Sequence, residues 1–361
     1  MNTELLKRLC ETPGVPGREE RVRALIEQEA ADLFDEMEVD ALGSLICRRK
    51  PRAAGKGKKT GKKASKKTGD APVLMLLCHM DEIGFYVSSI DDNGFLWLNN
   101  AGGFDPRNLF SRRVLCVADK AEYKGVMNPG GRPVHISAPE ERTKVPAVKE
   151  FFVDLGMSGA EVKKRVKIGD YVVMDEPFIE MGDKLVSKAL DNRVACWLGI
   201  EAVRQLDKAG AGHRHEIVVA FTTQEEVGLR GARTASFAVR PDIGIGIDVT
   251  LSCDTPGVPS AETVTKQGEG AALHIKDSSF ISDHGLIGDL EALAKRKRIK
   301  VQRSILAAGG QDGAAAQQAA AGARAVGVTV GTRYIHTVTE MIDRRDLEAA
   351  RNLLAAYMSE V

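Results

Sequence analysis

Long apolar runs are missing from this sequence. No segment approaches the roughly 20 uninterrupted apolar residues that a membrane-spanning helix needs. The first residues include Glu4, Lys7 and Arg8 and lack the apolar core of a signal peptide. We therefore expect a cytoplasmic protein that neither crosses nor enters a membrane.

Cysteine and aromatic residues are also sparse. The six cysteines are scattered along the chain and form no C-x-x-C pair. Scattered thiols of this kind are typical of the reducing cytoplasm, where they act mostly as small buried side chains. Aromatic residues make up 5% of the chain, so we expect no stacking surface for nucleic acid.

Acidic residues are absent from one segment. Residues 48–67 (RRKPRAAGKGKKTGKKASKK) hold eleven Lys and Arg residues, although the whole chain has a net charge of only +1. The segment has no apolar face, so we predict a disordered Lys-rich insertion over residues 48–69. It can be a solvated loop or an arm that binds polyanions, and the lack of neighbouring aromatic residues favours the loop.

The rest of the chain has the composition of a globular enzyme, with 361 residues, 43% hydrophobic and 28% charged. Short apolar runs alternate with helical patterns, which predicts an α/β fold with a helix-covered, mostly parallel sheet. The expected strands include residues 73–78, 217–221, 242–248, 301–306 and 325–330. The expected helices include residues 3–38 (interrupted near Pro13), 194–206, 286–297, 312–321 and 344–359.

A different pattern runs from residue 87 to residue 178. Short alternating segments there are separated by Gly, Asn and Pro turns, which predicts a small β-barrel. A capping pair, Ser158 and Glu161, marks one helix within it. We therefore divide the chain into a first catalytic part (1–86), an inserted β-domain (87–178) and a second catalytic part (179–361).

Ionisable residues follow several of the predicted strands. The apolar run Ile217–Phe221 leads directly to Glu225 and Glu226. Ligands of open α/β sheets bind at the carboxyl ends of the strands, where such side chains gather. The residues that this argument brings together are His79, Asp81, Asp191, Glu225, Glu226, Asp248 and His336.

Each of these residues also has an ordinary explanation. Asp191, for example, precedes a helical pattern and could simply cap that helix. The set as a whole is harder to explain in this way, because imidazole and carboxylate ligands without cysteine suit zinc, cobalt or manganese. The excess of carboxylates over histidines favours two cations that share a bridging carboxylate.

Five motifs in this chain carry a family resemblance. They are residues 79–85 (HMDEIGF), 188–193 (KALDNR), 223–232 (TQEEVGLRGA), 246–250 (GIDVT) and 333–336 (RYIH). The chain resembles metallopeptidase family 42, the glutamyl and tetrahedral aminopeptidases, some of which carry the label "cellulase M". The resemblance implies a zinc-peptidase-like catalytic domain with an inserted β-domain that pairs subunits.

The resemblance also implies a role for each residue of the set. Asp191 would bridge two divalent cations, for which zinc is the first choice and cobalt or manganese the alternatives. One cation would be completed by His79 and Asp248, and the other by Glu226 and His336. Glu225 would be the catalytic base. Asp81 would hydrogen-bond the His79 imidazole or otherwise steer the geometry of the site.

The function implied by the resemblance is removal of N-terminal residues from short peptides. Such proteins form homo-oligomers, so we expect at least a dimer and, at the largest, a hollow tetrahedral dodecamer. The chain departs from the family pattern at Gln311, Gly331 and Thr337. We expect these positions to lie on the substrate side and to bear on specificity, because acidic, basic and aliphatic preferences all occur among such proteins.

Two other functions compete with the aminopeptidase. An endoglucanase-type glycoside hydrolase needs two carboxylates that flank a sugar ring. We expect the side chains of the adjacent residues Glu225 and Glu226 to diverge from a strand end, which does not suit that task. A non-catalytic metal-binding scaffold would not need a spare carboxylate such as Glu225 beside a complete ligand set.

Overall fold

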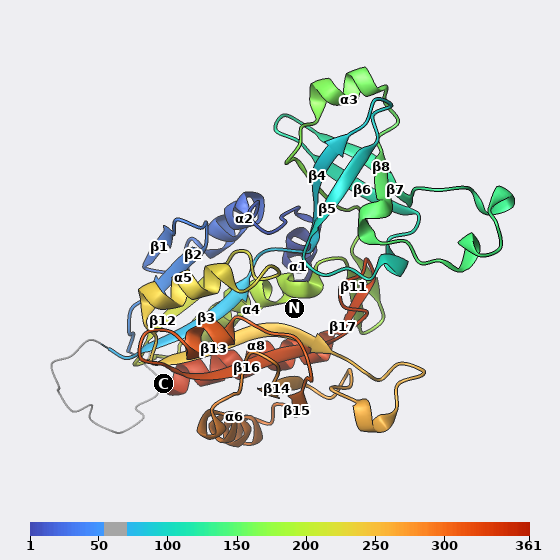
Figure 1. Cartoon of the computed structure of the whole chain (residues 1–361). Coiled ribbons are helices and arrows are strands. Elements are labelled where there is room, and N and C mark those ends of the chain that lie inside the picture. Colours follow the sequence, from blue (N-terminus) through green and yellow to red (C-terminus); the bar gives the residue numbers. More distant parts are fainter. Residues whose placement is uncertain (54–70) are drawn as a thin grey trace.

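A mixed β-sheet forms the centre of the larger part of the molecule (Figure 1). The computed structural model describes residues 1–53 and 71–361. Four neighbouring strands at the middle of the sheet are parallel, in the order β12 (Glu216–Thr222), β3 (Val73–His79), β13 (Ile243–Leu251) and β16 (Arg324–Arg333). The predicted α/β fold is therefore confirmed, with its parallel pairing concentrated in the centre.

The flanking strands attach mostly in antiparallel fashion. On one side of the centre lie β1 (Glu36–Val39) and β2 (Leu45–Arg49). On the other side lie β17 (Glu340–Asp343), β11 (Lys184–Ser187), β10 (Ile179–Met181) and the pair β14 (Ala271–Lys276) and β15 (Val301–Ile305). Only β14 and β15 pair in parallel among these flanking strands.

Helices cover both faces of the sheet, because the central strands are apolar on both sides. In β3, Leu74, Leu76 and Cys78 belong to one buried cluster, whereas Met75 and Leu77 belong to another. The first cluster includes residues of α1 (Thr3–Glu11), α2 (Glu20–Ala30), α4 (Leu190–Lys208), α6 (His284–Lys297) and α8 (Arg344–Glu360). The second includes residues of α5 (Arg230–Val239) and α7 (Gly313–Gln317).

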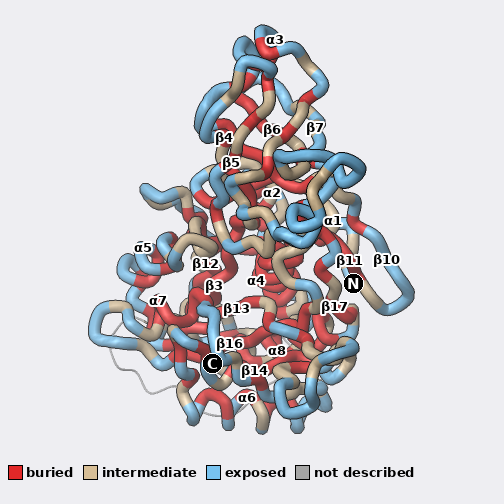
Figure 2. The backbone as a smooth tube through the Cα atoms, turned by 45° about the vertical axis from the view of Figure 1, so that its right-hand side comes forward, coloured by how far each residue is buried: buried red, intermediate tan, exposed pale blue. Residues whose placement is uncertain are grey.

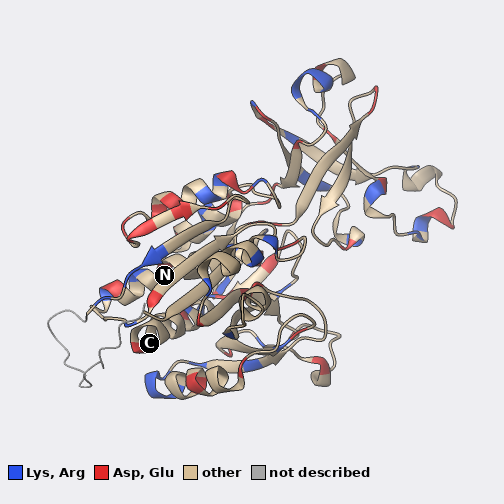
Figure 3. Cartoon of the chain, turned by 60° about the vertical axis from the view of Figure 1, so that its left-hand side comes forward, with Lys and Arg blue, Asp and Glu red and all other residues tan. Residues whose placement is uncertain are grey.

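Burial and charge follow this layered arrangement. Buried residues concentrate in the central strands and in the helix faces against them (Figure 2). Charged residues lie mainly on the outer helices and loops, and the central strands carry few (Figure 3). No helix within the described part of the chain is both long enough and apolar enough to cross a membrane.

The inserted domain is a closed antiparallel barrel, as predicted. Its six strands follow the order β4 (Gly84–Ile90), β5 (Leu96–Ala101), β8 (Phe151–Asp154), β7 (Glu122–Pro129), β6 (Arg112–Val117) and β9 (Tyr171–Met174). Alternate residues, such as Phe85, Leu98 and Val153, point inward and form a core of their own. The helix α3 (Gly159–Arg165) begins at the predicted capping pair, where the Ser158 hydroxyl donates to the Glu161 carboxylate.

Three expectations about local structure need correction. The predicted helix over residues 3–38 ends earlier, because residues 36–38 pair with β2 as part of β1. The predicted helix over residues 312–321 is only the five-residue α7. Arg48 and Arg49 belong to β2 and not to a disordered insertion. Residues 54–70, which contain most of the predicted Lys-rich insertion, lie outside the described residues.

Arg49 is buried although it stands in a basic sequence. Its guanidinium forms an ion pair with Asp207 and donates a 2.7 Å hydrogen bond to the Leu33 carbonyl oxygen. Its Nε atom lies 3.3 Å from Nε2 of His213. The side chain thus connects β2 to α4 and to the segment after α2. These contacts offset the desolvation free energy of a buried cation.

We expect Arg49→Ala to lower the free energy of unfolding by about 2 kcal/mol, since several hydrogen bonds of a buried cation are lost. We expect a smaller loss than for a fully buried ion pair, because the Asp207 side chain is 40% exposed. Urea denaturation measures it. The neighbouring Arg48→Ala is the control and should change stability by less than about 0.5 kcal/mol, because Arg48 is only half-buried and makes surface ion pairs. Equal effects of the two substitutions would contradict this role of Arg49.

Candidate metal centre

The register of the parallel strands brings His79 and Asp248 to one edge of the sheet. His79 is the last residue of β3 and lies opposite Thr222, the last residue of β12. In β13, Gly246 lies opposite Leu77 of β3, so Asp248, two residues further on, is level with His79. The two side chains meet there, with 3.9 Å between Nε2 of His79 and Oδ1 of Asp248.

The turn after β12 brings Glu225 and Glu226 to the same edge. Gln224, just before them, has a φ of +56°, a left-handed conformation that is common in tight turns. The backbone N–H of Glu225 donates to Oδ1 of Asp81 at 3.1 Å, and that of Glu226 donates to Oδ2 of the same carboxylate at 3.0 Å. The buried Asp81 carboxylate therefore fixes the turn that presents both glutamates.

Asp191 directs its carboxylate into the cluster and does not cap α4. Asp191 and Asn192 have non-helical backbone angles at the start of α4, and the regular helix after them is capped by Asn192, whose Oδ1 atom accepts a hydrogen bond from the Ala195 N–H at 3.1 Å. The two carboxylate oxygens of Asp191 each lie 3.3 Å from an imidazole, Oδ1 from Nε2 of His79 and Oδ2 from Nε2 of His336. Asp191 thus occupies the bridging position between the two histidines.

Glu340, at the start of β17, is a further residue of the site that the sequence analysis did not identify. Its carboxylate is buried and accepts two backbone N–H groups, from Asp191 at 2.9 Å and from His336 at 2.8 Å. It holds the two segments that carry these residues at a fixed separation. Glu340 follows His336 by four residues without any recognisable motif, so no sequence signal pointed to this contact.

The candidate ligand atoms form three overlapping groups, each with all its atoms within 4.8 Å of one another. The first group is His79, Asp191 and Asp248, and the second is Asp191, Glu226 and His336. The third, His79 with Glu225 and Glu226, links them. The first two groups share Asp191, so the donor set has the composition that two divalent cations with one bridging carboxylate require.

The electrostatics of the cluster also fit cations. Burial, with a contribution from Asp191, raises the pKa of both Glu226 and Asp248 above the usual range. Burial by itself would lower the pKa of His336, but Asp191 and Glu226 raise it to about 12. Carboxylates outnumber imidazoles in this buried space, so the negative charge needs positive partners.

The His79 ring is held by a backbone carbonyl group. Its Nδ1 atom lies 3.2 Å from the carbonyl oxygen of Asp81 and 3.5 Å from the Asp81 carboxylate. A carbonyl oxygen only accepts, so Nδ1 carries the hydrogen, and Nε2 is the ring atom that faces the cluster. Of the two roles expected for Asp81, its carbonyl group fills the first, and its carboxylate steers the two glutamates.

One further expectation, about the two adjacent glutamates, is modified by the structure. The Glu225 and Glu226 side chains do not diverge, because one oxygen of each lies within 4.8 Å of the other. Catalytic carboxyl groups of glycoside hydrolases stand about 5 Å apart or more to admit a sugar. Both carboxylates face the same group of ligand atoms as His79, whereas the two groups of a glycoside hydrolase flank a sugar ring.

Gln311, one of the three departures, does not face a substrate. Its side chain is buried across two strands, and a Cβ atom at Gly246 would come within 2.1 Å of its Oε1 atom. A Cβ atom at Gly327 would come within 2.5 Å of its Nε2 atom. Gln311 therefore packs against the face of the sheet at Gly246 and Gly327, whereas Thr337 lines a pocket beside His336. Gly331 packs against Thr265.

An ion pair fixes the strand end that leads to His336. Arg333, the last residue of β16, donates two 2.7 Å hydrogen bonds to the Asp254 carboxylate. Asp254 also accepts from the Ser252 hydroxyl and from the Gln267 N–H. The hydrogen bonds from Arg333 lower the pKa of Asp254 from 3.8 to about 2.

Because the pKa of Asp254 is depressed in the folded state, its carboxylate stabilises the fold above pH 4, and this contribution disappears as the pH falls towards 2. We expect Asp254→Asn to lower the free energy of unfolding by about 2 kcal/mol at pH 7 and by about half as much at pH 3. Denaturant titrations at both pH values measure this. The exposed control Asp289→Asn should have little effect, and a pH-independent loss for Asp254→Asn would refute the assignment.

Comparison with known proteins agrees with this geometry. Residues 61–353 match the family described as M42 glutamyl aminopeptidase. A protein of Acetivibrio thermocellus is 36% identical over 353 residues, which cover 97% of this chain and 96% of that protein. The lysyl aminopeptidase of Pyrococcus furiosus is 29% identical, covering 99% of this chain and 97% of that protein.

Solved structures show the same fold. The TET aminopeptidase of a Thaumarchaeota archaeon superposes with a TM-score of 0.90 at 32% identity, covering 99% of this chain and 96% of that one. The TET1 peptidase of Pyrococcus horikoshii, described as able to assemble into a tetrahedron or a large octahedral shell, gives 0.84 at 28% identity and covers 99% of both chains. A Thermotoga maritima protein named as an endoglucanase gives 0.76 at 27% identity, covering 98% of this chain and 96% of that one. Since the family match extends over most of its length, the chain belongs to the M42 glutamyl aminopeptidase family of metallopeptidases.

Proposed function

We propose that this protein is a dinuclear metal-dependent aminopeptidase that removes the N-terminal residue from short peptides. One observation carries the proposal: the Asp191 carboxylate lies 3.3 Å from both His79 and His336 and belongs to two ligand groups at once. A carboxylate shared by two histidine-containing groups is the arrangement that two cations with one bridging ligand require.

In this proposal His79, Asp191 and Asp248 hold one cation, and Asp191, Glu226 and His336 hold the other. Zinc suits the imidazole and carboxylate donors best, and cobalt and manganese are the alternatives. When bound, such cations supply Lewis acidity, which polarises a carbonyl group and makes a water molecule easier to deprotonate.

Glu225 is the proposed base. Its carboxylate lies 3.8 Å from Nε2 of His79, and neither of the two Asp191-containing groups needs it as a ligand. Its backbone is held by Asp81, so the side chain keeps a fixed position at the edge of the cluster. From there Glu225 takes a proton from the attacking water and returns it to the departing amine.

We expect Glu225→Gln to lower kcat at least about 100-fold while the bound metal content stays unchanged, because only the proton acceptor is removed. Asp191→Ala should instead lose metal, since both ligand groups need that carboxylate. Kinetics with a peptide amide and elemental analysis of the purified variants separate the two effects. The exposed control Glu4→Gln should keep both activity and metal. A Glu225→Gln variant with normal turnover would show that another group is the base.

Removal of metal tests the proposed reaction against its alternatives. After dialysis against a chelator, peptidase activity should disappear and return with Zn²⁺, Co²⁺ or Mn²⁺. A glycoside hydrolase of the two-carboxylate type would hydrolyse a cellulose-derived substrate with or without metal. A structural scaffold would hydrolyse neither substrate at any stage.

We also propose that the protein forms homo-oligomers through its barrel. A long segment between β7 and β8 extends away from the barrel (Figure 1), and it exposes Val134, Ile136 and Val145, of which Ile136 is 68% exposed. Exposed apolar side chains that lie close together are typical of interaction surfaces. A dimer is the smallest assembly we propose, and a tetrahedral dodecamer is the largest.

Light scattering at low and high salt tests the assembly. We expect a mass of at least two chains, and Ile136→Asp should shift the population towards the monomer because it places a charge in an apolar contact. A monomeric wild-type protein at both salt concentrations would refute the proposal. Growth from dimer to a larger particle at high salt would indicate that repulsion between the Lys-rich segments opposes closure.

The cytoplasm is the compartment we propose. All six cysteines are free thiols, and all except Cys253 are buried, which fits a reducing environment.

A further inference from the structure

Three consecutive backbone N–H groups of the turn after β12 donate to buried carboxylates. Those of Glu225 and Glu226 donate to Asp81. The N–H group of Gln224 donates to Oε1 of Glu19 at 2.9 Å, and it has no other acceptor among the described residues. The turn that carries the proposed base is therefore held by two separate segments of the chain, and Glu19 belongs to the one that no ligand comes from.

The Glu19 carboxylate does not serve its own helix. Glu19 stands at the N-cap position of α2, but its side chain makes no capping hydrogen bond there. The residue is buried, and Oε1 accepts a second hydrogen bond from the Gly17 N–H at 2.8 Å. Burial and the neighbouring Asp81 carboxylate raise the pKa of Glu19 to about 7. Burial of a carboxylate is unfavourable and α2 gains no cap from it, so its contribution lies in the contact with the turn.

Gln224 needs such a contact because of its backbone conformation. Its φ of +56° is uncommon for a residue other than glycine and persists only where the surroundings hold it. The Glu19 carboxylate holds its N–H group, and the Arg230 N–H donates to its carbonyl oxygen at 3.2 Å. Because Glu225 is the next residue, a change in the backbone angles of Gln224 would redirect the Glu225 side chain.

The segment that leads to Glu19 is itself anchored on two sides. Arg193, in α4, donates a 2.7 Å hydrogen bond to the Thr12 carbonyl oxygen. On the barrel side, the Tyr86 hydroxyl donates to the Pro16 carbonyl oxygen at 2.6 Å, and Val15 lies in a buried cluster with residues of β6 and β9. Glu19 therefore reaches the turn from a fixed support, which a residue that positions another group requires.

We propose that Glu19 is a positioning residue for Glu225: its carboxylate holds the Gln224 N–H group and thereby fixes the turn from which Glu225 reaches the ligand groups. This inference rests on the function proposed above, in which Glu225 is the base. Glu19 belongs to none of the three ligand groups, so it acts through the turn. Its loss should slow the step in which Glu225 moves a proton and should leave substrate binding largely intact.

The first experiment compares two variants of Glu19 in the metal-loaded protein. Glu19→Ala removes the acceptor and should lower kcat about 10-fold with KM changed less than about twofold, because only the geometry of the proton transfer suffers. Glu19→Gln keeps an acceptor oxygen and should keep kcat within about twofold of the wild-type value. A normal kcat in Glu19→Ala, or equal losses in the two variants, would overturn the inference.

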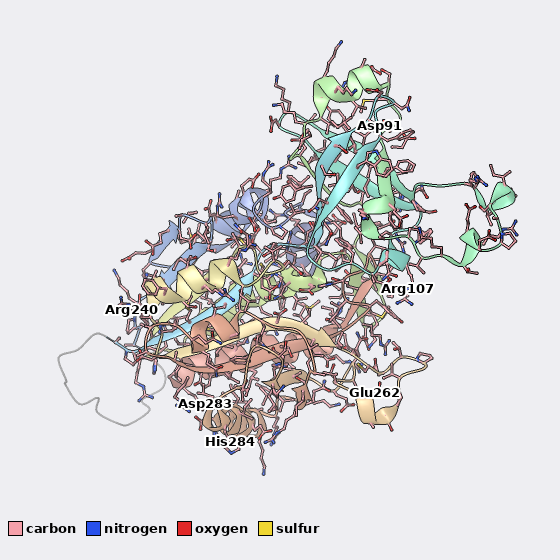
Figure 4. The ribbon with its side chains drawn as sticks, in the orientation of Figure 1. Asp91, Arg107, Arg240, Glu262, Asp283 and His284 are labelled. Carbon is pink, nitrogen blue, oxygen red and sulfur yellow. The ribbon has the colours of Figure 1, made fainter. Side chains whose placement is uncertain are left out.

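Asp91→Ala is the matched control. The Asp91 carboxylate also accepts two backbone N–H groups on one oxygen, from Asn93 at 2.9 Å and from Phe95 at 3.0 Å. It lies in the β4–β5 turn, at the end of the barrel away from the sheet (Figure 4). Asp91→Ala should lower the Tm but leave kcat unchanged. A loss of kcat equal to that of Glu19→Ala would attribute the effect to lower stability and overturn the inference.

Hydrogen–deuterium exchange separates this inference from the proposed function, because it needs no turnover. The Gln224 N–H should be protected in the wild-type protein and in Glu19→Gln, and it should exchange at least about 10-fold faster in Glu19→Ala. If this pattern is found but the wild-type protein hydrolyses no peptide, the positioning of the turn stands and the proposed function fails. If peptides are hydrolysed but the Gln224 N–H is unprotected in the wild-type protein, the positioning role fails and the function stands.

Discussion

Two buried carboxylates that accept backbone N–H groups hold the candidate site together. Asp81 binds the N–H groups of Glu225 and Glu226, and Glu340 binds those of Asp191 and His336. Each carboxylate thereby positions two residues of the cluster through their main chains, which leaves the side chains of those four residues free to face one another. The ligand geometry therefore depends on contacts made behind the ligands.

Much of this site could be predicted from the sequence, because the pairing of parallel strands determines where the residues at the strand ends lie. His79 and Asp248 follow apolar runs, and parallel pairing of those runs makes the two residues level. The contact of Glu340 could not be read in this way, since it depends on how β17 returns beside β11 and not on any local pattern. The same holds for Asn192, whose capping role differs from that of its neighbour Asp191 only through the local backbone.

The two positions that the sequence analysis placed wrongly, Arg49 and Gln311, are buried for related physical reasons. Arg49 and Gln311 are polar residues in polar or Gly-rich sequence surroundings, which normally indicate exposure. Both are buried because of distant parts of the chain. Asp207 and a backbone carbonyl group bind Arg49, whereas Gly246 and Gly327 leave the room that Gln311 occupies, and its Oε1 atom has no hydrogen-bond partner among the described residues. Burial of a polar group is decided by such distant partners, so local composition is a weak guide to it.

The apolar cluster that joins Leu109 and Met174 of the barrel to Val338 of the catalytic part makes the pocket beside His336 a product of two folding units. Neither unit encloses the pocket alone, whereas the ligand groups belong entirely to the sheet and its helices. The β5–β6 connection also approaches two of the ligand residues, since a Cβ atom at Gly102 would lie 3.4 Å from Glu226 and one at Gly103 would lie 3.6 Å from His336. The orientation of the barrel is therefore part of the geometry of the site, although none of the candidate ligands comes from the barrel.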